Sequence, residues 1–292
     1  MKIVVIGAGA MGSIYGGHLS QNNEVYIVDT KQEIVDAINK DGLKIDEDGV
    51  TNVYHPKAVT STEGITDVDL VILFVKSTFS KAALEGNKNI IGEHTRLLMQ
   101  YAPKERVIIG TTEDNGAVLG MGHVRRGGVG KTNAGMLTQD SEGFLVKMKE
   151  SFDSCGFTLK ICENIQQLIW DKLFTNVSLS AVTGILQVDM GYIADDEYAW
   201  NLTKALIHEA VLVAKAMGLE ADEEAIVKKV SDTSVNNPNG CTSIRADLRD
   251  GRRTEVDTIS GAVVRAGHEY NVAVPSHEFV VNMVHAMEGR DK

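Results

Sequence analysis

The first 31 residues constrain the fold of this chain more than any other stretch. Residues 2–6 are a short apolar run rich in β-branched side chains, which predicts a buried strand. The segment GAGAMG follows at residues 7–12, and helical spacing continues over 13–19. A second apolar run at 25–28 ends at Asp29. This order of strand, glycine-rich turn, helix and strand predicts a βαβ unit.

The three glycines of this segment suit a turn that binds a nucleotide. Gly7 can make the tight turn, Gly9 lets the backbone approach a pyrophosphate, and Gly12 lets the helix pack closely on the strand. Phosphates would bind the N–H groups near the helix start, around Ala10 and Met11, where the helix dipole favours negative charge. Glycine loops are common, but here an acid lies 22 positions after Gly7, at the end of the next strand. That context predicts a dinucleotide site.

Asp29 indicates which dinucleotide is bound. A carboxylate can accept hydrogen bonds from both ribose hydroxyls of NAD, and it would repel the 2′-phosphate of NADP. Lys31 lies two residues further on and could soften this preference, so NADP is the alternative. Lys76 follows an apolar run at 70–75, at the sheet edge where ligands bind, and is a candidate cofactor contact. A solvated lysine at a strand end explains it equally well.

The pattern of the chain changes near residue 163. Before it, strand-like and helical segments alternate; the strands are expected at 70–75, 95–99, 107–110 and 158–161, and the helices at 31–39, 79–89 and 144–155. After it, helical patterns dominate, at 165–188, 197–217, 221–230, 254–270 and 276–287. We therefore expect an α/β class, with a Rossmann dinucleotide-binding domain at 1–163 and an all-helical domain at 164–292.

A glycine-rich stretch at 118–136 predicts extended hairpins within the first domain. Arg125 and Arg126 lie among its glycines. Two adjacent arginines could form an anion site, but exposed turn residues are the more common explanation.

Charge and cysteine content exclude several classes of function. The net charge of −11 argues against nucleic acid or an anionic membrane as a partner. The three cysteines lack the spacing of metal ligands, and their odd number argues against a disulfide framework, so we expect no metal site. The first core strand begins at residue 2, and no apolar run approaches membrane-spanning length. A cytoplasmic protein without a signal peptide is expected.

The helical segment at 165–188 carries a row of polar residues. Lys172, Asn176 and Ser180 recur every four positions, which puts them on one helix face beside apolar neighbours. Such a row suits a site where an ammonium protonates a developing alkoxide and an amide orients the substrate, because desolvation lowers the pKa of a lysine toward neutrality. A solvated helix stripe is the alternative from the pattern alone.

A third stretch, at 243–257, reads SIRADLRDGRRTEVD, and Thr254 before Glu255 in it resembles a helix start. Together with GAGAMG and the run KLFTN at 172–176, it gives nearly the whole chain a resemblance to the ketopantoate reductase (2-dehydropantoate 2-reductase) family. The resemblance implies a Rossmann domain, a helical domain and an active site in the cleft between them. It also implies hydride transfer from C4 of a reduced nicotinamide to the ketone of a 2-oxo acid, giving a D-2-hydroxy acid.

The resemblance further implies roles for individual residues. Lys172 would be the general acid that protonates the carbonyl oxygen, Asn176 would bind the substrate, and Ser243 would hold its carboxylate end. Glu255 would contact the substrate and tune Lys172, since an ion pair between them favours the charged lysine and opposes desolvation. The resemblance to this family also implies a homodimer formed through the helical domain.

Two departures from the family bear on specificity. Ser180 stands where the family has a second Asn that helps recognise the hydroxyl of pantoate, and Asp29 favours NADH where the family usually favours NADPH. Both point to an NAD-dependent D-2-hydroxyacid dehydrogenase of the D-mandelate dehydrogenase type, a branch of the same family. Reduction of ketopantoate with NADPH, as in pantothenate synthesis, is the alternative.

A third departure follows Gln100, where the family continues Gln-Asn-Gly and this chain continues with Tyr101. Either this loop is deleted, or its residues are missing from the sequence. We favour the second explanation, because loss of the loop would open the active site.

Two other classes of protein share part of the pattern. A β-hydroxyacid dehydrogenase would share the nucleotide domain and a lysine–asparagine helix but would oxidise a 3-hydroxy acid. A non-catalytic nucleotide sensor would keep the glycines and Asp29 and would not need Lys172.

Overall fold

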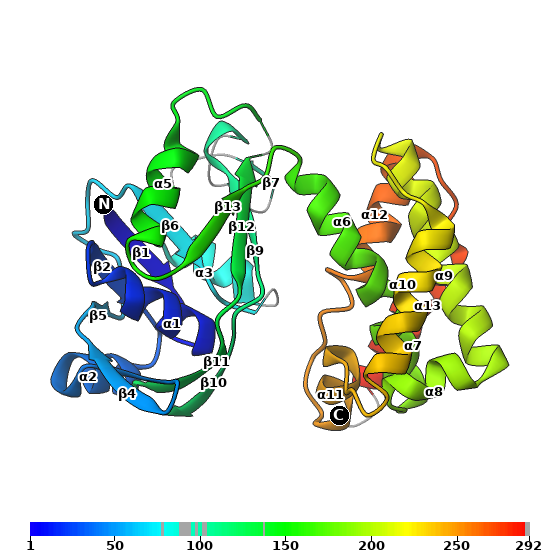
Figure 1. The fold of residues 1–292 in the computed structure, drawn as a ribbon, viewed down its shortest axis with the longest axis horizontal. Helices are drawn as coiled ribbons and strands as arrows, with labels where there is room; N and C mark the ends of the chain where they lie inside the picture. The colour runs from blue at the N-terminus through cyan, green and yellow to red at the C-terminus, as the bar shows by residue number, and fades with distance from the viewer. Residues whose placement is uncertain (77–78, 88–94, 97–98, 101–103, 137, 290–292) are drawn as a thin grey trace. The chain divides into compact units, whose positions relative to one another are not determined.

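The computed structural model describes residues 1–76, 79–87, 95–96, 99–100, 104–136 and 138–289. The chain forms two compact units, Met1–Ile165 and Gln166–Lys292 (Figure 1). The sequence predicts the boundary after residue 163, and the structure divides after residue 165. Each unit has its own hydrophobic core.

Unit 1 is built on a four-stranded parallel sheet in the order β5-β2-β1-β6. The central strand β1 (Lys2–Ile6) pairs with β2 (Glu24–Val28) on one side and with β6 (Leu70–Leu73) on the other. β5 (Lys57–Val59) pairs with the far side of β2. The last four residues of β1 are at most 3% exposed, as expected for a central parallel strand covered on both faces. The predicted α/β class is confirmed.

β6 differs from the expectation of a fully buried strand. Leu70 and Ile72 pack against one hydrophobic cluster, and Val71 and Leu73 pack against another, so both faces are covered. Each of the four residues is nevertheless only half-buried. The reason is position, because β6 is the last strand of this sheet within the described residues.

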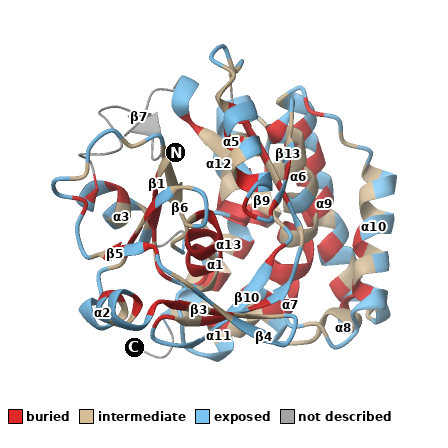
Figure 2. Ribbon diagram, turned by 60° about the vertical axis from the view of Figure 1, so that its left-hand side comes forward, coloured by how far each residue is buried: buried red, intermediate tan, exposed pale blue. Residues whose placement is uncertain are grey.

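Helix α1 (Ala10–Leu19) lies directly against the sheet, starting three residues before the predicted position (10 against 13). A Cβ atom at Gly12 would lie 1.8 Å from the carbonyl oxygen of Gly7, and one at Gly16 would lie 2.6 Å from Cδ1 of Ile27. Only hydrogen fits at these positions, so the helix can approach the strands. Eight of its ten residues are buried, and Figure 2 shows α1 and β1 mostly in the colour of buried residues.

Three further sheets are found among the described residues of unit 1. One has the order β10-β11-β3-β4 and packs against α1, another has the order β13-β12-β9, and the third pairs two short strands. The strands of the first two are β3 (Leu43–Glu47), β4 (Val50–Tyr54), β9 (Ile108–Thr112), β10 (Asn115–Gly120), β11 (His123–Gly128), β12 (Lys131–Met136) and β13 (Thr158–Ile161). Within the described residues of unit 1, the helices besides α1 are α2 (Gln32–Asp41), α3 (Ser80–Gly86), the short η2 (Lys104–Arg106) and α5 (Phe144–Asp153). In place of one strand at 95–99, the structure has two short antiparallel strands, β7 (Thr95–Arg96) and β8 (Met99–Gln100).

Arg126 corrects the expectation that both arginines of the glycine-rich stretch are exposed. Arg125 is exposed on β11, but Arg126 is 6% exposed and donates two hydrogen bonds to Oδ1 of Asp114, at 2.7 and 3.1 Å. The Tyr15 hydroxyl of α1 donates to the other oxygen of Asp114 at 3.1 Å, and burial raises the pKa of Tyr15 to about 12. Burial acts to raise the pKa of Asp114, but hydrogen bonds led by those from Arg126 lower it overall. Arg126 therefore balances a buried carboxylate that ties α1 to the second sheet.

Unit 2 is helical, as predicted. Its elements are α6 (Ile165–Thr175), the π-helical turn η3 (Asn176–Ser180), α7 (Ala181–Leu186), α8 (Met190–Asp195), α9 (Glu197–Ala216), α10 (Glu223–Asn236), α11 (Ser243–Arg249), α12 (Ser260–Tyr270) and α13 (Pro275–Glu288). The long helix α9 packs against η3 and α7, α8, α10, α12 and α13, and its inward face supplies much of the core. The sequence did not predict α8 or α11. The helix expected at 254–270 begins only at Ser260, because residues 255–259 form turns.

The close contact at Gly12 can be tested by substitution. Gly12→Ala should destabilise unit 1 by about 3 kcal/mol or more, because backbone atoms must move to admit the Cβ. Alanine favours a helix interior over glycine, so propensity alone predicts the opposite sign. Gly9→Ala is the matched control, since a Cβ there meets no atom within 4 Å. Thermal and urea unfolding measure the difference, and equal stability of the two variants would contradict the explanation.

Candidate functional site

The glycine-rich turn and Asp29 lie together at the carboxyl ends of β1 and β2. Gly7 has φ +103°, a conformation that glycine adopts without strain, and its N–H donates to the Val28 carbonyl at 2.8 Å. One carboxylate oxygen of Asp29 accepts the N–H of Ala8 at 3.0 Å, and the other accepts the N–H of Lys31 at 3.0 Å. These bonds hold a negative charge next to the turn.

This turn fits the pyrophosphate and ribose of a dinucleotide. Gly9 is the residue before α1, and no side chain caps the helix there. A Cβ added at Gly9 would meet no atom within 4 Å, so the space in front of the turn is open. The first-turn N–H groups of α1, including those of Ala10 and Met11, therefore face a position where an anion can bind.

Lys76 stands at the same edge of the sheet. β1 and β6 are parallel with Ile6 opposite Leu73, so the chain after Leu73 emerges beside the glycine-rich turn. Lys76 is exposed, and its carbonyl accepts the N–H of Phe79 at 2.8 Å. Its contact with a cofactor stays a prediction.

The polar row of unit 2 is built on a helix interrupted by a π turn. Lys172 on α6 is exposed, Asn176 at the start of η3 is half-buried, and Ser180 at its end is 6% exposed. In an uninterrupted α-helix each step of four residues overshoots a full turn by about 40°, so Ser180 would drift away from Lys172. A π turn contains more residues, so a step of four within it rotates less and turns Ser180 back toward the Lys172 side. The expected uniform helix is therefore wrong, and the shared face of the three residues stays a prediction.

Ser243 lies at the first position of α11, which packs against η3 and α7. A Cβ at Gly184 of α7 would lie 2.5 Å from Cγ2 of Ile244, so these two helices are in close contact. The Thr183 and Thr242 hydroxyls are 2.7 Å apart and form a buried hydrogen bond. Ser243 is exposed, and the helix that carries it packs against the segment that carries Asn176 and Ser180.

Glu255 lies in the turns before α12 and is half-buried. The residues around it are anchored to α13: the N–H and the hydroxyl of Thr254 both donate to one oxygen of Glu288 at 2.7 Å. His285 bonds Asp257 through Nε2 at 2.9 Å and Glu288 through Nδ1 at 3.0 Å. Sequence reasoning missed His285 and Glu288, because no local pattern links α13 to a segment about 30 residues earlier. The expected ion pair between Glu255 and Lys172 stays a prediction.

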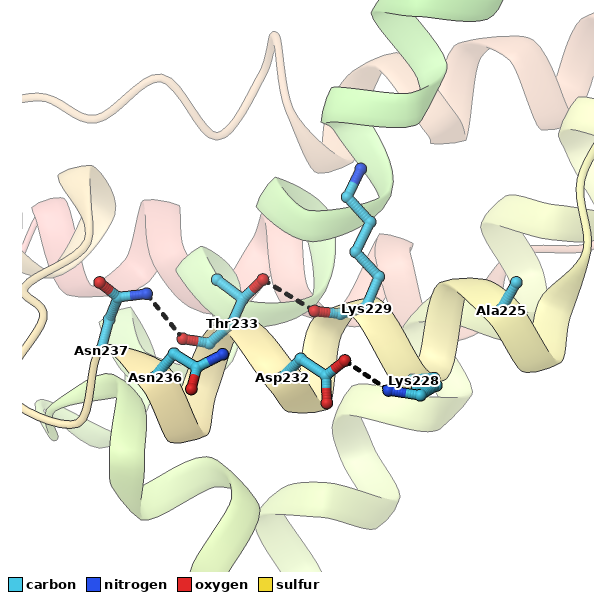
Figure 3. A pocket seen from close by; sticks show the side chains of 7 residues that line it. All are labelled: Ala225, Lys228, Lys229, Asp232, Thr233, Asn236 and Asn237. Atoms are coloured by element: carbon cyan, nitrogen blue, oxygen red, sulfur yellow. Dashed lines mark hydrogen bonds and ion pairs between the residues drawn. The ribbon is translucent and has the colours of Figure 1, made fainter.

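Two shallow hollows lie along α10. Figure 3 shows the first, which is lined by Ala225, Lys228, Lys229, Asp232, Thr233, Asn236 and Asn237. Lys229 reaches from it to the backbone carbonyl of Asp171 at 3.2 Å. The second is lined by residues of α10 together with Trp200 of α9. The candidate catalytic and substrate-binding residues line neither hollow.

The described part of the chain holds no cluster of three or more His, Cys, Asp or Glu side chains suited to a metal ion. None of the helices within the same residues is long and apolar enough to cross a membrane.

Comparison with known proteins identifies similar chains over the whole length. The family model described as "Ketopantoate reductase PanE/ApbA" matches residues 3–139, and "Ketopantoate reductase PanE/ApbA C terminal" matches 164–288. The 2-dehydropantoate 2-reductase of Pyrococcus horikoshii is 31% identical over 99% of this chain and 98% of its own. A solved structure of a putative 2-dehydropantoate 2-reductase from Enterococcus faecalis is 28% identical with a TM-score of 0.85. A ternary structure of D-mandelate dehydrogenase with NADH and anilino(oxo)acetate is 27% identical, also with a TM-score of 0.85. Both structures align with 99% of this chain and 98% of their own chains.

The alignment with the Pyrococcus protein extends over 301 positions, more than the 292 residues of this chain, so that relative carries residues that this chain lacks. The sequence itself is continuous from Gln100 to Tyr101. Deletion of the loop and absence of its residues from the sequence both account for these two facts, so the explanation of this departure stays a prediction. Residues 101–103, where the family's loop would follow, lie outside the described residues.

The anchor formed by His285 predicts a pH dependence of stability. Its hydrogen bond to Glu288, helped by Asp257, raises the pKa of His285 above 6.5 despite partial burial. A raised folded-state pKa contributes stability that is complete below about 6.5 and is lost as pH rises through the folded value. Burial acts to raise the pKa of Glu288, but bonds from Thr254 and His285 lower it overall, so its own contribution is lost only in acid.

His285→Gln should therefore lower the thermal unfolding midpoint at about pH 6 and have much less effect at about pH 9. His268→Gln is the control, because His268 pairs with Glu278 on a surface where its side chain is 66% exposed. A penalty for His285→Gln that is the same at both pH values would show that the charge of His285 is not what anchors the segment.

Proposed function

The chain belongs to the ketopantoate reductase family, whose members are oxidoreductases, and we propose that it transfers hydride between NAD(H) and a bulky 2-oxo acid, producing a D-2-hydroxy acid. The observation that carries this proposal is the position of Asp29. Its carboxylate is bonded to the N–H of Ala8 inside the glycine-rich turn.

The fixed carboxylate supports NAD over NADP. An adenosine ribose bound at this turn would place its hydroxyls near Asp29, which can accept hydrogen bonds from them. A 2′-phosphate at that position would meet a negative charge that the bond from Ala8 keeps in place. Lys31 is exposed, and its backbone N–H donates to Asp29. Its side-chain ammonium is a nearby positive charge that could favour the 2′-phosphate of NADP. The D-mandelate dehydrogenase of similar fold was solved with NADH.

Ser180 supports a substrate other than ketopantoate. The Ser180 side chain is shorter than the Asn side chain that the family has at this position, so its hydroxyl reaches less far. The residue is 6% exposed. The shorter side chain leaves room for a bulkier substituent on the 2-oxo acid and offers fewer hydrogen bonds to a substrate hydroxyl. Anilino(oxo)acetate, bound in the D-mandelate dehydrogenase structure, is a bulky molecule of this type.

The residues of unit 2 would then carry out proton transfer and orientation. When bound, a reduced nicotinamide supplies the hydride that is added to the carbonyl carbon. Lys172 would donate a proton to the carbonyl oxygen and so complete the alcohol, and because it is exposed it can regain a proton from water. The side-chain amide of Asn176 would hydrogen-bond the carbonyl oxygen or an adjacent oxygen of the substrate, and the hydroxyl of Ser243 would donate to the substrate carboxylate. Oxidation of the alcohol would reverse each step.

Reduction of ketopantoate is the second candidate function. The curated relatives with 28–31% identity over 97–99% of this chain are named 2-dehydropantoate 2-reductase. These names favour the reduction of ketopantoate, so the case for a different 2-oxo acid depends on Asp29 and Ser180.

The initial rates with three 2-oxo acids separate the two candidates. We expect benzoylformate or 2-oxoisocaproate to be reduced faster than ketopantoate, and NADH to be preferred to NADPH, because Asp29 opposes the 2′-phosphate. The measurement is kcat/KM for every pair of cofactor and acid. A preference for ketopantoate with NADPH would overturn the proposal in favour of the second candidate. Oxidation of 3-hydroxyisobutyrate without activity on 2-oxo acids would overturn both.

The role of Lys172 predicts a loss of rate without a loss of cofactor. Lys172→Met should lower kcat by about 10²–10⁴-fold, the usual contribution of a general acid, and leave the Kd for NADH unchanged. Lys228→Met, which removes a lysine paired with Asp232 on the exposed side of α10, is the matched control and should leave both unchanged. Turnover by Lys172→Met within a few-fold of the native rate would exclude this role.

A further inference from the structure

The π turn between Asn176 and Ser180 is supported by two hydroxyl groups. Ser178, which is fully buried, donates to the carbonyl of Phe174 at 2.7 Å, in the last turn of α6 just before the π turn. Thr183, also fully buried, donates to the Leu179 carbonyl at 2.7 Å, at the end of the turn. A change of helical pitch disturbs the regular backbone bonding, and hydroxyls at i+4 can bond the affected carbonyls. The wide turn is therefore held by specific side chains.

Thr183 makes a second bond that joins another element. Its Oγ1 is 2.7 Å from Oγ1 of Thr242. The proton of Thr183 is committed to the Leu179 carbonyl, so Thr242 is the donor in this pair. The Thr183 hydroxyl thus accepts a hydrogen bond from Thr242, before α11, and donates one to Leu179 in the π turn.

The behaviour of Thr242 is unusual for its position. It is the N-cap residue of α11, where a threonine hydroxyl normally accepts a backbone N–H of its own helix. No such cap bond is present, and the hydroxyl bonds Thr183 instead. The Thr242 hydroxyl therefore links the start of α11 to α7 and does not cap its own helix.

We propose that Thr183 is a positioning residue that fixes Ser243 relative to Asn176 and Ser180. Thr183 lies one turn beyond Ser180, and Thr242 directly precedes Ser243. One buried hydrogen-bond chain therefore connects the π turn to the N-cap residue of α11, next to Ser243. This inference rests on the proposed function, in which these three residues bind opposite parts of one 2-oxo acid. Thr183 itself contacts no substrate and would act by holding the binding groups at the correct separation.

Loss of the Thr183 hydroxyl should therefore weaken substrate binding more than it slows the chemical step. Thr183→Val keeps the shape of the side chain but removes both bonds and leaves the Thr242 hydroxyl buried without its acceptor. We expect KM for the preferred 2-oxo acid to rise by about tenfold or more, with a smaller change in kcat and an unchanged Kd for NADH. Thr183→Ser restores the hydroxyl and should recover most of the native KM.

Thr203→Val is the matched control. Thr203 is also fully buried in unit 2, and its hydroxyl has no hydrogen-bond partner within the described residues. This control should leave KM unchanged. A rise in KM for Thr203→Val equal to that for Thr183→Val would overturn the proposal, because it would reflect general disturbance of the core.

A double-mutant cycle tests the coupling itself. Thr242→Val removes the same hydrogen bond from the other side, so its effect on KM and that of Thr183→Val should be strongly non-additive in the double variant. Additive effects would overturn the proposal. If Thr183→Val does not fold, Thr242→Val alone should still raise KM, and a native KM for that variant would overturn it.

Crystal structures distinguish failure of this inference from failure of the proposed function. A native protein that reduces no 2-oxo acid would overturn the proposed function. The positioning role would then be decided by the structures of native protein and Thr183→Val. A return of residues 176–180 toward α-helical geometry, or a displacement of 242–243, supports it, and unchanged positions overturn it.

Discussion

The close approach of Gly12 to the carbonyl of Gly7 is the constraint on which unit 1 depends. With only hydrogen at residue 12, α1 lies directly on β1, and the N-terminal N–H groups of the helix are placed beside the carboxyl edge of the sheet. The same proximity buries Tyr15 against Asp114, which Arg126 neutralises. A larger residue at position 12 would disturb both the nucleotide-binding turn and the packing behind it. In this unit the binding site and the core thus share a single requirement.

Unit 2 positions its candidate catalytic and substrate-binding side chains in a different way. There a π turn, bonded at its ends by Ser178 and Thr183, changes the angle at which Ser180 leaves the helix. The turns that carry Glu255 have backbone hydrogen bonds of their own, and the network of Thr254, His285 and Glu288 also anchors them to α13. Irregular backbone at both places is stabilised by buried or half-buried polar bonds. Such bonds are typical of segments whose position matters for function.

Some of these features were predictable because they depend on residues close together in the sequence. The turn at 7–12, the parallel βαβ unit and Asp29 form one local motif, and the structure confirms the class of fold that this motif predicts. The helical character of unit 2 follows from periodic apolar residues, so its long helices were found while their exact ends were not. The short helices α8 and α11 escaped prediction because six or seven residues carry too little periodicity.

The sequence by itself thus determined the α/β class, the change to a helical unit and the residue types available for cofactor binding and proton transfer. Only the tertiary structure decided that Arg126 is buried, that a π turn separates Asn176 from Ser180, and that Thr183 meets Thr242. The physical reason is the range of the interactions. Hydrophobic periodicity and glycine stereochemistry act over a few residues, whereas the Arg126–Asp114 and Thr183–Thr242 bonds join residues 12 and 59 positions apart, and only packing brings such residues together.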